Sequence, residues 1–105
     1  MIPNKLRVCG LDYTINICNV KDMTPGCSGI HNSDISEIRI LGDSMSVQRQ
    51  QQIFFHELMH AIDVTYNNNK LTEDQVDVLA NGIYQVLSDN NLLNSNIFDG
   101  VRGAE

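Results

Sequence analysis

The chain has 105 residues, which is enough for one domain with a single hydrophobic core but not for two. Hydrophobic residues make up 42% of it, a fraction typical of a folded globular protein rather than a disordered one. The formal net charge is −6, with 13 acidic residues against 7 Lys and Arg, and the basic residues form no cluster. Duplex nucleic acid and anionic membrane surfaces are therefore poor partners, whereas a peptide or protein substrate is compatible with this charge.

The N-terminal segment has no apolar stretch of the kind found in signal peptides, and no apolar run elsewhere approaches the length of a membrane span. We therefore expect a cytoplasmic protein. The three cysteines, Cys9, Cys18 and Cys27, are an odd number, which argues against a disulfide framework. We expect them to be small buried residues on strands.

The first forty residues have the pattern of strands. Alternating apolar and polar residues indicate strands around 6–8 and 13–18, a short strand at 28–31 and a clearer one at 36–40. Turn-forming residues separate these segments, most clearly at Thr24-Pro25-Gly26. We expect the strands to form a small antiparallel, meander-like sheet.

A long helix is predicted from about Ser46 to Val64, because no strong helix breaker occurs there. Its apolar stripe, which can pack on the sheet, consists of Phe54, Leu58, Ala61 and Ile62. His56, Glu57 and His60 lie beside that stripe, and an Asn-rich segment then ends the helix.

A second helix is predicted to begin after Thr72, which forms a capping box with Gln75, and to end near Asp89. Its expected apolar stripe consists of Val76, Leu79, Ala80, Ile83 and Leu87. Residues 1–90 should thus form one α+β domain, in which the sheet is followed by two packed helices carrying a metal site. Residues 91–105 should form a tail with little regular structure.

The stretch HELMH on the first helix has the pattern of a metal site. Residues four apart on a helix have Cβ atoms about 5–6 Å apart, so His56 and His60 can both reach one ion at about 2.0–2.1 Å. Glu57 is rotated away from that ion but can reach a water beside it, as a general base does. The alternative is an amphipathic helix with two exposed histidines and no metal.

A third ligand should come from the next helix, since a catalytic zinc needs three protein ligands and an open position. Glu73 and Asp77 lie four apart on one face: one can bind the ion while the other accepts a hydrogen bond from a ligand histidine. Asp74 is a rival ligand that points farther from Ala80. An acid at position 73 is also favoured simply by the helix dipole, but Asp77 is a poor helix former in the middle of a helix.

The two motifs, HELMHAID at 56–63 and EDQVD at 73–77, resemble the paired H-E-x-x-H and E-x-x-x-D helices of gluzincin metallopeptidases, the thermolysin-like group. The order of the elements and the small size are also similar to compact ImmA/IrrE-like and phage-associated zincin domains. The resemblance implies one Zn²⁺ per chain bound by His56, His60 and Glu73, with Glu57 as general base and Asp77 supporting a histidine.

Larger gluzincins stabilise the oxyanion with a histidine or tyrosine from a C-terminal subdomain for which this chain has no room. His31, Tyr66 and Tyr84 are the candidates for that role, although Tyr84 falls between apolar positions and can equally belong to the core. Asp63, near the end of the first helix, is expected to orient a histidine, to bind loop amides or simply to lie on the surface.

The resulting hypothesis is a zinc metalloendopeptidase whose activity is weak or highly substrate-specific, for example a regulator in a phage or mobile element. The strand at 37–41, if it is an exposed edge, would bind the peptide as an added strand. The alternative is a zincin-fold binding or regulatory protein whose zinc is structural or vestigial. Retention of Glu57 favours the peptidase, and the missing oxyanion donor favours the alternative.

Overall fold

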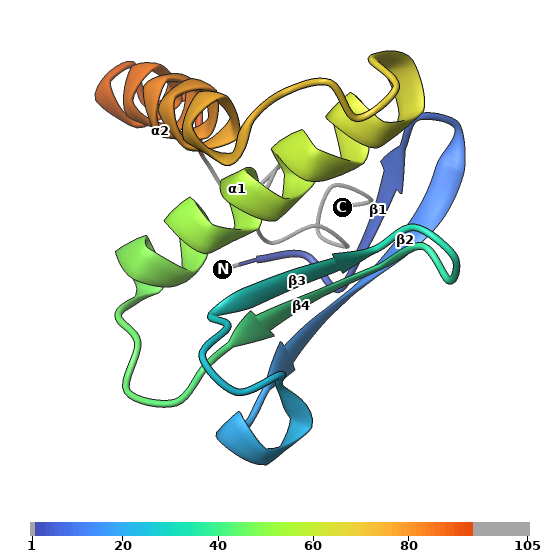
Figure 1. Ribbon diagram of the computed structural model, residues 1–105. Helices are drawn as coiled ribbons and strands as arrows, with labels where there is room; N and C mark the ends of the chain where they lie inside the picture. Colours follow the sequence, from blue (N-terminus) through green and yellow to red (C-terminus); the bar gives the residue numbers. More distant parts are fainter. Residues whose placement is uncertain (1, 94–105) are drawn as a thin grey trace.

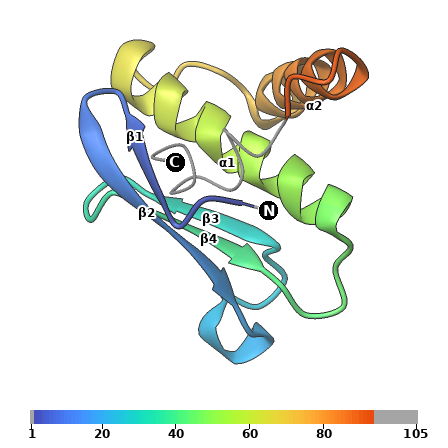
Figure 2. The same ribbon diagram turned by 180° about the vertical axis from the view of Figure 1, so that it is seen from behind.

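The computed structural model describes residues 2–93 and has an α+β fold, as predicted: a sheet of four strands precedes two helices (Figures 1 and 2). The strands are β1 (Lys5–Val8), β2 (Leu11–Cys18), β3 (Gly29–Asn32) and β4 (Glu37–Leu41). The helices are α1 (Val47–Tyr66) and α2 (Glu73–Asp89), and a single 3₁₀ turn, η1 (Val20–Asp22), follows β2. The tail expected at 91–105 lies, from residue 94 on, outside the described residues.

The sheet is mixed, not the antiparallel meander that the sequence suggested. The strand order is β1-β2-β4-β3, with antiparallel pairs at both ends and a parallel pair, β2 and β4, in the middle. After β2 the chain passes through η1 and forms β3 at the edge of the sheet. The turn after β3 leads to β4, which lies between β3 and β2. Alternation of apolar residues is the same in both kinds of pairing, so the sequence pattern could not distinguish them.

The hypothesis that residues 37–41 bind a peptide required this strand to be an exposed edge, and it is not one. β4 pairs with β2 on one side and with β3 on the other, and its Ile38 and Ile40 are fully buried. Within residues 2–93 the edge strands are β1 and β3, and β3 is the edge strand that contacts α1. A peptide added to the sheet beside α1 would therefore pair with β3.

Helix α1 lies between the sheet and α2 (Figures 1 and 2). Phe54 and Ala61 of its predicted stripe are buried, Leu58 packs against the core, and Ile62 is exposed. The core also includes Tyr13, Ile15, Ile38, Ile40, Ile53, Phe55, Ala80 and Tyr84. In this arrangement α1 contacts both the edge strand β3 and helix α2.

The second helix buries a face slightly different from the predicted one. Val76 and Ala80 are buried as expected, but Leu79 and Ile83 are exposed, and Tyr84 is buried in their place. The helix begins as predicted, with a capping box. The side chain of Thr72 accepts a hydrogen bond from the backbone N–H of Gln75, and the side chain of Gln75 accepts one from the backbone N–H of Thr72.

The cysteines are less buried than expected. Cys9 and Cys18 are half-buried, and Cys27, in the loop before β3, is exposed. Among residues 2–93, neither helix is both long and apolar enough to cross a membrane.

Candidate metal centre

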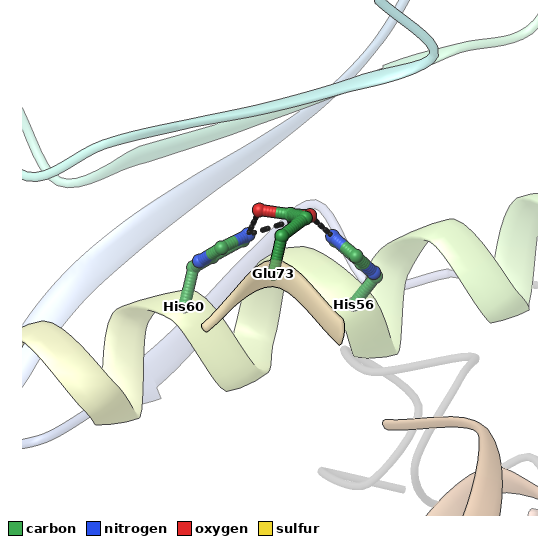
Figure 3. Close-up of side chains that lie close together, drawn as sticks. All are labelled: His56, His60 and Glu73. Atoms are coloured by element: carbon green, nitrogen blue, oxygen red, sulfur yellow. Dashed lines mark hydrogen bonds and ion pairs between the residues drawn. The ribbon is translucent and has the colours of Figure 1, made fainter. Parts of the chain in front are cut away.

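The middle of α1 places two imidazoles side by side. His56 and His60 are one turn apart, their ring centroids are 4.9 Å apart, and their side chains are 22% and 23% exposed. They face α2 (Figure 3). Both rings therefore lie at a surface that ions can reach, on an element whose backbone holds their spacing fixed.

The short connection between the helices is what brings the third residue to them. Asn68 and Asn69 adopt left-handed backbone conformations, with φ of 54° and 58°, which asparagine tolerates better than most residues. The buried carboxylate of Asp63 accepts hydrogen bonds from Asn67 Nδ2 at 2.9 Å and from the backbone N–H of Leu71 at 3.3 Å. Of the three predicted roles for Asp63, the structure shows the binding of loop amides.

Glu73, the first residue of α2, lies against both histidines (Figure 3). One carboxylate oxygen, Oε1, is 2.6 Å from His56 Nε2 and 3.4 Å from His60 Nε2, and Oε2 is 3.3 Å from His60 Nε2. One ligand atom from each of the three residues lies within 4.8 Å of the others. These three residues are thus close enough to hold a metal ion.

The separations can be compared with those that a bound ion requires. Two ligands at about 2.0–2.1 Å from a tetrahedral ion are about 3.3–3.4 Å apart. The contacts between Glu73 and His60 already have this length, whereas His56 and Glu73 are joined by a shorter hydrogen bond. Binding of an ion would therefore require at least the hydrogen bond between His56 and Glu73 to lengthen.

Charge at this point is compatible with metal binding. Partial burial acts to raise the pKa of the Glu73 carboxyl, but the hydrogen bond to His56 and the charges of the two imidazoles outweigh it, so that this pKa is lowered. The carboxylate is therefore ionised at neutral pH, which is the form that binds a cation.

The outer nitrogen of His56 has its own acidic neighbour. Asp77, one turn after Glu73 on α2, places Oδ1 3.4 Å from His56 Nδ1. The two groups form no hydrogen bond among residues 2–93. The predicted role of Asp77, to accept a hydrogen bond from a ligand histidine, therefore stays a prediction. Within residues 2–93 no ion pair or hydrogen bond joins Asp74, the rival ligand, to either imidazole, and Asp74 is exposed.

Glu57, the residue after His56, points toward β3 and is only 7% exposed. The fit is close: a Cβ added to Gly29 would lie 2.8 Å from Glu57 Oε2, 2.9 Å from its Cγ and 2.6 Å from Cγ2 of Ile53. Burial raises the pKa of the Glu57 carboxyl; His60 and His56 lower it, and Glu73 raises it further. Glycine at position 29 is what allows the strand to approach this carboxylate.

A cleft of about 240 Å³ runs along this face of α1 and contains the candidate base together with two of the three candidate ligands. Its lining residues are Cys27, Ser28, Gly29, Arg49, Gln52, Ile53, His56, Glu57, Glu73, Asp77 and Asn81. The sequence reasoning missed its outer part. Arg49, Gln52 and Ile53 precede His56 at helical spacings, so the periodicity that located the histidines could also have indicated them.

The three candidates for oxyanion stabilisation lie elsewhere. His31 of β3 stacks on Tyr13, with Nε2 2.8 Å from the tyrosine hydroxyl, and burial, followed by the charge of His60, lowers the pKa of its imidazole. Tyr84 donates to Gln51 Oε1 at 2.9 Å and packs on Phe55, and Tyr66 is 72% exposed at the end of α1. None of the three lines the cleft that contains Glu57.

Searches with models of known protein families, among curated proteins and among solved structures found no match to this chain.

Proposed function

We propose that the protein is a zinc-dependent metallopeptidase, a minimal zincin of the gluzincin type. The observation that supports this most strongly is the convergence of His56, His60 and Glu73 beside a cleft into which the buried carboxylate of Glu57 projects. A site that only bound metal would not need a buried, hydrogen-bond-free carboxylate next to it. Within residues 2–93, the side chain of Glu57 makes no hydrogen bond.

Two imidazoles and one carboxylate suit zinc, but the same donors also bind ferrous iron. The proximity of Glu57 favours zinc, because a general base is needed for hydrolysis and not for oxygen chemistry. A zinc ion held by these residues would polarise the scissile carbonyl and acidify a water molecule.

The protein groups would then have distinct roles. Glu57 accepts the proton of the attacking water and passes it to the leaving amine, and its raised pKa brings it closer to the range in which one group can serve as both base and acid. Asp77, whose Oδ1 lies 3.4 Å from His56 Nδ1, would orient the imidazole so that Nε2, which now contacts Glu73, could bind the metal.

The substrate would lie along β3 in an extended conformation. Because the backbone N–H of Leu41 bonds to the carbonyl of Ser28, the register of the two strands turns the backbone groups of Gly29 and His31 away from β4. They form the outer edge of the sheet beside the cleft and can pair with a peptide. His31→Pro should reduce peptide cleavage much more than His31→Ala; equal activities would exclude this pairing.

The test of the function combines metal analysis with one conservative variant. Wild type and Glu57→Gln should each bind about one zinc per chain, and only wild type should cleave members of a peptide library. Cleavage by Glu57→Gln at the wild-type rate would contradict the assignment of the base. Lack of zinc in both proteins would contradict the site itself.

A second function is favoured by one observation: none of the three oxyanion candidates lines the cleft. In this alternative, the chain is a zincin-fold binding or regulatory protein with a structural or vestigial zinc. It predicts that chelation lowers the melting temperature of wild type and of Glu57→Gln equally and that no peptide is cut by either.

A further inference from the structure

The cleft continues beyond the candidate metal ligands toward the beginning of α1. Arg49 lies at this outer end, on the same face of the helix as Gln52 and His56. The seven residue steps from Arg49 to His56 correspond to about 10 Å along a helix axis. Arg49 therefore lies in the same cleft as the site, but two helical turns from it.

The charges in the cleft are separated along its length. The acidic side chains Glu57, Glu73 and Asp77 surround His56 at the inner end. Along α2, Glu73 contacts both histidines, whereas Tyr84 contacts Gln51, so the helix passes from the metal-binding part of α1 toward its beginning. Asn81 lies on α2 between these two contacts, and the lining residues other than Arg49 and the three acids carry no formal charge.

Arg49 is the single cationic side chain among the described residues that line the cleft. Within residues 2–93 its guanidinium forms no ion pair, and its one hydrogen bond, to Gln52 Oε1, is long at 3.4 Å. The backbone N–H of Arg49, not its side chain, bonds to the N-cap Ser46. The guanidinium therefore has no structural role in starting the helix.

We propose that Arg49 is a specificity-determining residue, which binds a carboxylate of the substrate about three residues from the scissile bond. An extended peptide advances about 3.3 Å per residue, so three residues span the roughly 10 Å between His56 and Arg49. A guanidinium matches a carboxylate with two parallel hydrogen bonds. The proposal depends on the proposed function, because it names the class of substrate for that site.

The acidic inner end strengthens this selection. A substrate carboxylate shifted toward Glu57 or Asp77 would meet like charge, whereas one placed at the outer end meets Arg49. The carboxylate can belong to an Asp or Glu side chain or to the C-terminus of the peptide. Both sources present the same group and differ only in where the peptide ends.

The experiment uses zinc-loaded Glu57→Gln to capture peptides without cutting them. Random decapeptides are presented in two pools, one with free C-termini and one amidated, and the retained peptides are sequenced. The same selection is made with the double variant Glu57→Gln/Arg49→Ala. A matched control is Glu57→Gln/Arg7→Ala, which removes an exposed arginine of β1 that pairs with Asp12, away from the cleft.

We expect peptides with a carboxylate to be enriched about fivefold by Glu57→Gln and by the Arg7 control, as for a partly screened ion pair. Arg49→Ala should abolish the enrichment. Enrichment of Asp or Glu in both pools indicates a side-chain carboxylate, and stronger retention of the free pool than of the amidated pool without such enrichment indicates the C-terminus. Equal retention of the two pools without enrichment of Asp or Glu, a preference that persists in Arg49→Ala, or no retention would each overturn the proposal.

Cleavage by wild type tests the parent function separately. Peptides that it cuts should carry the carboxylate two to four residues from the cut bond. If peptide capture depends on Arg49 but wild type cuts no peptide, Arg49 binds a carboxylate and the protein is not a peptidase.

Discussion

Helix α1 contains two buried carboxylates that differ in their hydrogen bonds. Glu57 in its middle and Asp63 in its last turns are 7% and 1% exposed. Asp63 receives hydrogen bonds from Asn67 and Leu71 at Oδ1 and thereby binds the loop that leads to α2, while its Oδ2 is buried without a hydrogen-bond partner among residues 2–93. Glu57 receives none from residues 2–93 and is enclosed instead by Ile53 and by the backbone at Gly29.

This difference separates a structural acid from a candidate catalytic one. A buried carboxylate with hydrogen bonds stabilises the fold, because its donors would otherwise be left unpaired. A buried carboxylate without hydrogen bonds does not stabilise the fold, but burial raises its pKa, and the raised pKa suits proton transfer. Burial alone does not identify function; the partners of the buried group do.

The largest expected effect is that substitution of Glu57 lowers the cleavage rate, whereas substitution of Asp63 lowers the free energy of unfolding. Glu57→Gln should reduce cleavage by about 10²–10⁴-fold and leave the free energy of unfolding nearly unchanged. Asp63→Ala should lower the free energy of unfolding by about 1–3 kcal/mol and reduce cleavage far less. Urea denaturation and initial rates measure both, with the exposed Asp74→Ala as control; similar phenotypes for Glu57 and Asp63 would remove the distinction.

Asp77 extends the comparison to an exposed acid, with 60% of its side chain accessible. Asp77→Asn should weaken zinc affinity by about 10–100-fold if this carboxylate fixes the ring of His56. Competition with a zinc-binding dye measures the change, and Asp74→Asn on the same turn of the helix is the control. An affinity reduced equally in both variants would show a general effect of charge instead of orientation.

Gly29 provides a way to disturb Glu57 without changing any acid. In Gly29→Ala the new methyl group would lie 2.8 Å from Glu57 Oε2, so the carboxylate must move and cleavage should fall about tenfold with zinc content unchanged. Gly82→Ala is the counterpart, because nothing lies within 4 Å of a Cβ there. It should stabilise α2 by up to about 1 kcal/mol without reducing cleavage. Full activity of Gly29→Ala would contradict the positioning of the base.

The smallest effect concerns His31, whose imidazole is partly buried against Tyr13. Because burial and then His60 lower its pKa from 6.5, the folded state binds a proton less readily than the unfolded one. Its contribution to stability is complete above the unfolded pKa and declines as the pH falls from 6.5 toward the lowered folded value. In the presence of chelator, the urea midpoints of wild type and His31→Gln should therefore converge between pH 7.5 and pH 5; a constant difference would contradict the shift.

Local signals predicted the helices and most of the site. The capping box of Thr72 and Gln75 fixed the start of α2, and a spacing of four residues placed His56 and His60 on one face. Glu73 could be chosen because it opens α2 and the connection to α1 is short. Each of these inferences depends on neighbours in the chain, which a sequence displays directly.

Non-local pairing could not be predicted in the same way. The alternation in 37–41 revealed that Ile38 and Ile40 are buried, but not that β4 lies between β2 and β3. For the same reason the sequence could not identify β3 as an edge strand, and the approach of Gly29 to Glu57 was not foreseen. The sequence also gave no means to choose among the roles of Asp63, which depend on where the loop places Leu71.

The X-ray absorption spectrum of the zinc-loaded protein at the zinc edge tests the central claim most directly. The account predicts two imidazole nitrogens from His56 and His60, a carboxylate oxygen from Glu73 and one exchangeable oxygen, all at about 2.0–2.1 Å. The carboxylate contribution should be lost in Glu73→Ala. A sulfur ligand at about 2.3 Å, or a spectrum unchanged by Glu73→Ala, would contradict it.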